Sequence, residues 1–169
     1  MHPLYPVFHE RFRYENGVLF IKKAGQWKGK VGDRAGTAGG RNKKRIVIQV
    51  MGQRFFAHQV IWIMFHEDLP PAPLTIDHED LNPLNNRIEN LRVASPTEQQ
   101  ANSLLQSNNT SGFKGVSYNP NKNKGKPFRA VCKNKHIGWF KTAEEAAEAY
   151  DAEAVKLFGS FAKTNKELQ

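Results

Sequence analysis

The chain has 169 residues, of which 39% are hydrophobic, and a formal net charge of +9. This length allows one ordinary domain or two small ones, and no apolar run approaches the ~20 residues that span a bilayer. Cys132 is the single cysteine, which excludes an intrachain disulfide and any multi-cysteine zinc site. The N-terminus lacks a signal-peptide pattern, so we expect a soluble protein of the cytosol without a membrane partner.

The charge is unevenly distributed along the chain. Residues 1–57 carry a formal charge of +9, residues 58–102 carry −5 and residues 103–169 carry +5. Basic surfaces attract phosphate backbones whatever their sequence, whereas an acidic patch repels DNA unless a cation fills it. The pattern is compatible with a nucleic-acid partner, but acids that simply solvate a loop would give the same central charge.

The first part of the chain is predicted to contain two hairpins and a basic loop. Residues 7–21 indicate strand, turn and strand around Asn16-Gly17, a dipeptide that favours tight hairpin turns. Residues 22–44 are rich in Gly, Lys and Arg and are expected to form a mobile loop. Their glycines lack the strand-Gly-helix order of a phosphate cradle. A second hairpin is predicted over 45–57.

A short helix is predicted over residues 58–66, followed by a strand, a loop, a strand and a helix. The apolar side of the first helix comprises Val60, Ile61, Met64 and Phe65. The later elements are a strand over Thr75–His78, an asparagine-rich loop, a strand over Leu91–Ala94 and a helix over Ser95–Leu104. A Ser-Pro start and a glutamate three residues after the cap are typical of a helix N-terminus.

Asp77 and His78 stand side by side at the end of the first of these strands. A carboxylate and an amide from a following segment would suit one hard cation with open positions for water and phosphate. The imidazole would then be placed to activate water as a general base. By itself, the pair is also explained by a strand-end histidine bonded to a neighbour.

The whole stretch from Ala57 to Asn102 resembles the His-Asn-His (HNH) nucleases of the phage and homing type. The matching segments are Ala57-His58-Gln59-Val60-Ile61-Trp62, Leu74-Thr75-Ile76-Asp77-His78 and Asn86-Arg87-Ile88-Glu89-Asn90-Leu91-Arg92-Val93-Ala94-Ser95. The resemblance implies a ββα-metal unit that hydrolyses a DNA phosphodiester bond with one divalent ion, Mg2+ or Mn2+.

The resemblance also implies roles for single residues. Asp77 would ligate the metal, His78 would take a proton from the attacking water, and Asn90 would hold the loop so that His78 points correctly. Alignment from Asn90 places Gln99 where the family has a His or Asn as its second metal ligand. Gln99 has the same amide oxygen on a longer side chain, and Asn102, about one turn further along the same face, is the alternative ligand.

Two more residues are candidates for support of the site. His58 opens the helix before the site, where the family often has a histidine, and a role near the phosphate is one interpretation of it. Asn86 would brace the same loop as Asn90. A structural histidine at a helix start and a plain turn asparagine explain these two residues equally simply.

A different pattern follows the polar segment 103–111, which is the predicted linker. Strands are predicted over 112–118, 128–133 and 136–140, with a Lys/Asn/Gly hairpin tip over 119–127. A helix then starts at Thr142, with Glu145 completing a capping box, and stops at Gly159.

Residues 110–165 resemble the APETALA2-type DNA-binding domain, through Ser111-Gly112-Phe113-Lys114-Gly115-Val116 and Gly138-Trp139-Phe140-Lys141-Thr142-Ala143-Glu144-Glu145-Ala146-Ala147. The resemblance implies a sheet whose exposed face enters the major groove of double-stranded DNA, with the helix behind. The DNA-facing candidates carried over are Lys114, Ser117, Arg129, Val131, Lys133 and His136.

Three lysines at the hairpin tip, Lys122, Lys124 and Lys126, would reach phosphates, unless the tip is merely solvated. Alternation along the second strand puts Arg129 and Lys133 on one face, and Ala130 and Cys132 against the helix. Ser117, Val131 and His136 replace arginines and tryptophans of the plant members, so the expected base preference is looser or different.

Together these patterns predict an α+β protein of two domains. Residues 1–102 would form the HNH nuclease domain, with N-terminal β-hairpins over 7–57 and a ββα-metal core at about 74–104. After the linker, residues 112–169 would form an APETALA2-like domain with a three-stranded antiparallel sheet packed on one helix.

The predicted function is a metal-dependent DNA endonuclease whose C-terminal sheet binds the target. One ββα-metal site has a single reaction centre and no heptad pattern argues for a dimer, so a monomer that nicks one strand is the simpler expectation. The alternative is a sequence-recognising DNA-binding protein whose nuclease half is catalytically impaired, with Gln99 as the trace of the loss. An RNA-directed role ranks below both, because both resemblances are to DNA-binding proteins.

Overall fold

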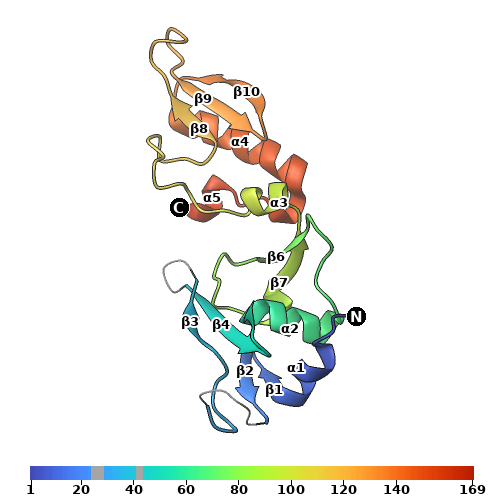
Figure 1. Ribbon diagram of the computed structural model, residues 1–169. Helices are drawn as coiled ribbons and strands as arrows, with labels where there is room; N and C mark the ends of the chain where they lie inside the picture. Colours follow the sequence, from blue (N-terminus) through green and yellow to red (C-terminus); the bar gives the residue numbers. More distant parts are fainter. Residues whose placement is uncertain (24–28, 41–43) are drawn as a thin grey trace. The chain divides into compact units, whose positions relative to one another are not determined.

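The computed structural model describes residues 1–23, 29–40 and 44–169. They form two compact units, Met1–Ser95 and Pro96–Gln169 (Figure 1). Each unit mixes helices with small antiparallel sheets, which confirms the predicted α+β class. The division falls at Ser95, so the predicted linker and the helix before it both belong to the second unit.

No helix in the described part of the chain combines the length and apolar character needed to cross a membrane.

The described residues of the first unit form three antiparallel sheets, β1-β2, β3-β4-β5 and β6-β7, and two α-helices. Its elements in chain order are α1 (Tyr5–Arg11), β1 (Phe12–Glu15), β2 (Val18–Ile21), β3 (Thr37–Gly39), β4 (Arg45–Val50), β5 (Gln53–Phe56), α2 (Ala57–His66), β6 (Thr75–His78), the 3-10 helix η2 (Ile88–Asn90) and β7 (Leu91–Ala94). The structure confirms the turn at Asn16-Gly17, the second hairpin, α2 and the paired strands β6 and β7.

Two predictions in this unit were wrong. The first strand was expected from residue 7, but α1 occupies this stretch, with a proline in its first turn and Phe8 fully buried. Part of the loop expected over 22–44 is strand β3, which pairs with β4. A Cβ on Gly39 would lie 2.5 Å from Cγ2 of Val47, so glycine allows this close pairing. Residues 24–28 and 41–43 of that expected loop lie outside the described residues.

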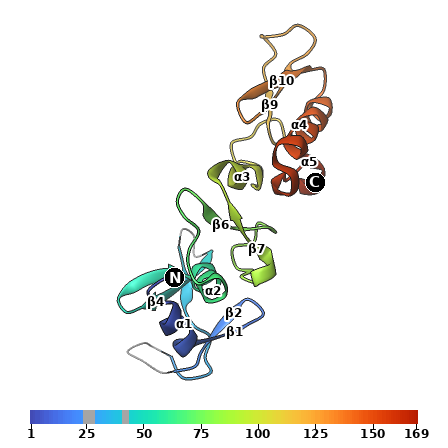
Figure 2. The same ribbon diagram turned by 90° about the vertical axis from the view of Figure 1, so that its right-hand side faces the viewer.

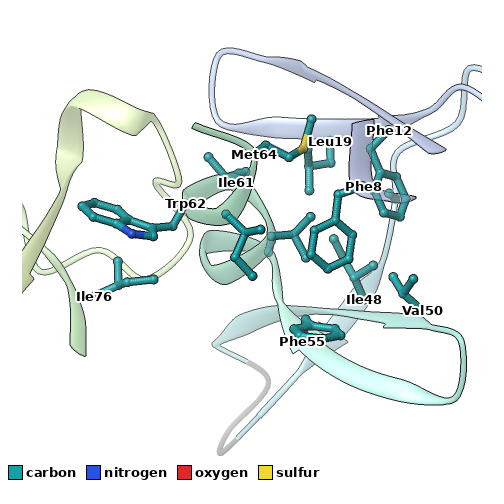
Figure 3. Close-up of a cluster of buried hydrophobic side chains, with 14 of the residues drawn as sticks. Phe8, Phe12, Leu19, Ile48, Val50, Phe55, Ile61, Trp62, Met64 and Ile76 are labelled. Atoms are coloured by element: carbon teal, nitrogen blue, oxygen red, sulfur yellow. The ribbon is translucent and has the colours of Figure 1, made fainter. Parts of the chain in front are cut away.

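Helix α2 is the centre of the first unit and is apolar almost all round. Five successive residues from Val60 to Met64 are buried, because sheet strands and α1 pack on different sides of the helix. Figure 3 shows Trp62 and Ile76 on one side of α2, with Phe8, Phe12 and the strand residues on another. The apolar side predicted for this helix was therefore too narrow. One of its predicted members, Phe65, is 49% exposed.

The second unit is a three-stranded antiparallel sheet in the order β10-β9-β8, with α4 along one face (Figures 1 and 2). Its elements are α3 (Pro96–Ala101), β8 (Val116–Tyr118), β9 (Phe128–Cys132), β10 (Lys135–Phe140), α4 (Ala143–Phe158), the 3-10 helix η3 (Gly159–Phe161) and α5 (Asn165–Leu168). The sheet on one helix is the arrangement predicted for this part of the chain. Helix α5 was not predicted.

Two of these elements are shorter than expected. Helix α3 ends at Ala101, and β8 begins only at Val116. Gly115 lies in a turn, with a φ of +74°, and a Cβ at this position would overlap the Tyr150 ring of α4. Glycine therefore allows the turn to pack closely on α4.

The start and core of α4 follow the prediction. The Thr142 hydroxyl accepts a hydrogen bond from the Glu145 amide at 3.1 Å, and Gly159 ends the helix. Ala130 and Cys132 are buried against the helix, while Arg129 is exposed on the other face. The alternation read from the sequence is therefore confirmed along β9.

Candidate active site

The β6-β7 hairpin places the predicted acid and base next to each other. In its register Asp77 lies opposite Arg92, and His78 lies opposite Leu91. The Asp77 Oδ2 atom is 3.4 Å from Arg92 Nε, and the two side chains are only 12% and 16% exposed. His78 is buried at 7% exposure, on the opposite side of the strand pleat. Arg92 thus balances the charge of a carboxylate that is largely removed from solvent.

His78 is oriented by Asn86, which is itself buried at 3% exposure. The distance between His78 Nε2 and Asn86 Oδ1 is 3.0 Å. The Asn86 amide nitrogen donates to the Leu84 carbonyl at 3.4 Å, which fixes the amide with its oxygen toward His78. Because an amide oxygen only accepts, Nε2 must carry the hydrogen, and the proton-accepting lone pair of the neutral ring is then on Nδ1.

The loop between the two strands is held closed by Asn90. Its amide nitrogen donates to Asp80 Oδ1 at 2.9 Å and to the Asn85 carbonyl at 2.8 Å, while its amide oxygen accepts from the Asp80 amide at 3.1 Å. Burial alone would raise the pKa of Asp80, but hydrogen bonds from Asn85, Asn82 and Asn90 hold it below its usual value. The polar residues of the loop therefore form a connected network that ends at His78 and Asn86.

His58, in the first turn of α2, packs beside His78. The two ring centroids are 5.1 Å apart in an edge-to-face arrangement, and His58 also stacks on Phe56. Burial, together with nearby His78 and Arg45, lowers the pKa of His58 to about 3. The ring is consequently neutral at physiological pH and forms one wall of the site.

The burial of neutral His58 predicts a pH-dependent stability. An unfolded histidine titrates near 6.5, so between that pH and about 3 the unfolded chain binds a proton that the folded chain does not. The free energy of unfolding should therefore decrease as the pH falls through this window, by about 1.4 kcal/mol per pH unit from this residue. Urea titrations from pH 7 to 4 should show a shallower decline for His58→Gln than for the wild type. Equal slopes in the two proteins would contradict this, and His136→Gln, at an exposed histidine, is the control.

The N-terminal hairpin supports the loop from outside. The Tyr14 hydroxyl accepts a hydrogen bond from the Ile88 amide at 3.0 Å. At the hairpin turn, a Cβ on Gly17 would lie 2.7 Å from the Arg87 nitrogen and 3.0 Å from the Asn86 carbonyl carbon. The turn therefore presses directly on the backbone of the residue that orients His78.

This contact predicts that Gly17→Ala destabilises the first unit more than a matched change elsewhere. Gly52 occupies the same place in the β4-β5 turn, with a φ of +78° against +84° at Gly17, but a Cβ there meets nothing within 4 Å. Both alanines carry the strain of a left-handed conformation, about 1–2 kcal/mol, and only Gly17→Ala adds a backbone clash of about 1–3 kcal/mol. Urea denaturation of both variants measures the difference. A loss that is no larger for Gly17→Ala than for Gly52→Ala would show that the loop does not depend on this contact.

The donor set for a cation is one carboxylate and amides. Among the described residues, no group of three or more His, Cys, Asp or Glu side chains is arranged to hold a metal ion. Asp77, whose side chain is 12% exposed and paired with Arg92, is the carboxylate of this set, and a single carboxylate suits Mg2+, which keeps several waters as ligands. Gln99 is half-buried and Asn102 is buried at 5% exposure, both in the second unit. Their role as ligands stays a prediction.

The DNA-facing candidates of the second unit are mostly on its surface. The exposed ones are Ser117, Lys122, Lys124, Lys126, Arg129 and His136, and Val131 is half-buried. Lys133 lies in the turn after β9, where alternation no longer applies, and its ammonium group is 5.9 Å from the centre of the Phe158 ring. The prediction that Lys133 shares the face of Arg129 was therefore wrong.

Lys114 does not lie on the open face of the sheet. It is 9% exposed, and its ammonium group donates to the carbonyls of Ala101, Ser103 at 3.0 Å and Lys163 at 3.3 Å. Burial lowers its pKa to about 8. The prediction that Lys114 contacts DNA does not fit this position. Its ammonium instead joins the end of α3 to the segment before α5.

Sequence reasoning missed two residues of these sites. Arg92 was not singled out, although the antiparallel pairing of two four-residue strands places it opposite Asp77. Trp139 was also overlooked, because its side of the sheet depends on an irregularity in β10 between His136 and Gly138.

Comparison with known proteins supports the nuclease interpretation of the first site. Residues 55–101 match the HNH endonuclease family. An uncharacterized HNH endonuclease of Acanthamoeba polyphaga mimivirus is 36% identical over 112 residues, which cover 64% of this chain and 56% of that protein. Protein 3.8 of Escherichia phage T7 is 41% identical over 61 residues, 36% of this chain and 50% of that protein.

The chain thus spans about half the length of these relatives. No solved structure matches it significantly. The family match ends at residue 101, so the resemblance of the C-terminal segment to APETALA2-type domains stays a prediction. The match includes His58, the Asp77-His78 pair and the Asn90 loop, so residues 55–101 are similar to an HNH endonuclease domain over the whole candidate site of the first unit.

Proposed function

We propose that this protein is a metal-dependent DNA endonuclease that hydrolyses a phosphodiester bond at the end of β6. The observation that carries the proposal is the buried hydrogen bond of 3.0 Å between His78 and Asn86, next to Asp77. The hydrogen bond at Nε2 sets the ring tautomer and leaves the lone pair that a general base uses on Nδ1. The match to the HNH endonuclease family supports the same reaction class.

In this proposal Asp77 and Gln99, with Asn102 as the alternative, hold a divalent ion, Mg2+ or Mn2+. When bound, the ion supplies charge stabilisation for the scissile phosphate and the leaving oxygen. His78 accepts a proton from the attacking water at Nδ1, and Asn86 keeps Nε2 protonated. Asn90 keeps the loop closed, and buried His58 limits the movement of the His78 ring.

The second unit is proposed to bind double-stranded DNA through the open face of its sheet. Exposed Arg129 at the centre and exposed lysines at the 119–127 tip supply the positive charge. One reaction centre per chain makes nicking by a monomer the expected reaction.

The test is conversion of supercoiled plasmid by the purified full chain, with Mg2+, Mn2+ or EDTA. Accumulation of open circle only with a divalent ion is the expected result. Linear product that appears before open circle would instead indicate paired active sites. If no divalent ion supports cleavage but salt-sensitive DNA binding persists, the protein is a DNA-binding protein with an impaired nuclease site, and Gln99 marks the lost ligand.

A further inference from the structure

Strand β10 contains a bulge that brings two aromatic rings to one face of the sheet. His136 pairs with Val131, but the next pair is Gly138 with Ala130, so Ile137 is an extra residue. In a regular strand, residues three apart point to opposite faces. Here His136 and Trp139 lie with ring centroids 6.1 Å apart.

Trp139 belongs to the open face and not to the core. The partly buried apolar residues that pack against the core of this unit are Phe113, Phe128, Ile137, Phe140, Phe158 and Ala162. Trp139 is not one of them, although it is the largest side chain of β10. The bulge residue Ile137 packs against the core, and Trp139 does not.

The strand register aligns Trp139 with two polar side chains. Arg129, on the middle strand, pairs with Ser117 of β8 and with Trp139 of β10. A hydroxyl, a guanidinium and an indole therefore cross the sheet in one row. With strands about 4.8 Å apart the row is about 10 Å wide, which fits within a major groove about 12 Å wide.

The charges of the unit favour a polyanion on this face. Residues 112–141, which form the sheet and its turns, contain eight Lys or Arg and no Asp or Glu. Five acidic residues are on α4, behind the sheet, namely Glu144, Glu145, Glu148, Asp151 and Glu153, and the other two of the unit, Glu98 and Glu167, are on α3 and α5. The sheet layer would therefore meet the phosphates while the helix layer faces away.

We propose that Trp139 is a specificity-determining residue that packs against the 5-methyl group of a thymine, next to a guanine contacted by Arg129. The guanidinium fork matches the two acceptors of guanine, and the thymine methyl is the apolar group that a major groove offers to an indole. The inference rests on the proposed binding of duplex DNA by this sheet, but not on cleavage.

The experiment removes only that methyl group. The full chain carrying His78→Ala, in EDTA, selects its preferred duplex from a randomised pool, and each thymine of that duplex is then replaced by deoxyuridine. At one position next to a guanine, the replacement should weaken binding about fourfold, the contribution of one buried methyl group. The Trp139→Ala protein should bind the thymine duplex and the deoxyuridine duplex with equal affinity. The Trp139→Phe protein should retain most of the fourfold difference between these two duplexes.

The control variant is Tyr118→Ala, at an aromatic side chain of the same sheet that is 53% exposed and outside the row; it should keep the full deoxyuridine effect. An equal deoxyuridine effect in Trp139→Ala and wild type, or its absence at every thymine, would overturn the proposal. So would the absence of an enriched sequence, or tighter binding to single-stranded oligonucleotides than to the duplex. Because binding is measured without divalent ions, loss of the nuclease function would not affect the result.

Discussion

Replacing His78 with alanine is expected to lower the rate of plasmid nicking about a thousandfold, within the range that a positioned general base contributes. The ring is buried, held through Nε2 by Asn86 and flanked by His58, whose pKa of about 3 makes it a much weaker base. DNA binding should be unchanged, because the proposed binding face lies in the second unit. Single-turnover nicking with Mg2+ and a parallel binding titration measure the two effects.

The control for this variant is His9→Ala, at an exposed histidine of α1. It should nick at the wild-type rate. A His78→Ala protein that keeps its fold by circular dichroism and still nicks at more than a tenth of the wild-type rate would exclude His78 as the general base.

Asn86→Ala is expected to have the second largest effect, a rate about 10- to 100-fold lower. The substitution leaves Nε2 of His78 without its amide acceptor, so the ring can rotate and change tautomer. The loss should appear in kcat, with KM for DNA little changed, because Asn86 is buried and holds the base instead of the substrate.

Asn82→Ala provides the matched comparison in the same loop. Asn82 is exposed, and its side-chain oxygen accepts from the Leu84 amide at 3.1 Å, away from His78. This variant should retain nearly full activity. Equal losses in both variants would mean that the loop as a whole, and not the His78–Asn86 bond, sets the rate.

The local elements of the site were predictable because their signals are short-range. The HNH-like segments predicted β6 and β7, and the asparagine-rich sequence between them predicted a loop. Helix α1 was missed because Pro6 at its start was given less weight than the alternating pattern that follows it. Strand β3 was missed because its glycine argues against a strand on local propensity. Gly39 is needed for the close approach to Val47, a contact with another strand that local propensity does not include.

Contacts between distant segments were beyond the reach of pattern reasoning. The support of Asn86 by Gly17 depends on how the first hairpin packs, about seventy residues earlier in the chain. The bulge at Ile137 also sets the face on which Trp139 lies, because a strict period of two would put His136 and Trp139 on opposite faces. Lys114 was predicted to face DNA from the APETALA2 resemblance, whereas its three carbonyl partners come from separate segments that no local pattern brings together.

Lys114, which joins α3 to the rest of the second unit, determines where this protein can be recombined with others. A chimera that keeps residues 1–102 and replaces the remainder would separate the Ala101 carbonyl at the end of α3 from the Lys114 ammonium. Six-residue α3 would then lack the packing that a helix of this length needs. A graft with its junction between Ser95 and Pro96 keeps the Lys114 bonds intact, so exchanged modules should fold at that junction and fail to fold a few residues later. Because Gln99 and Asn102 leave with the exchanged module, the incoming module must bring its own α3 ligand for the metal.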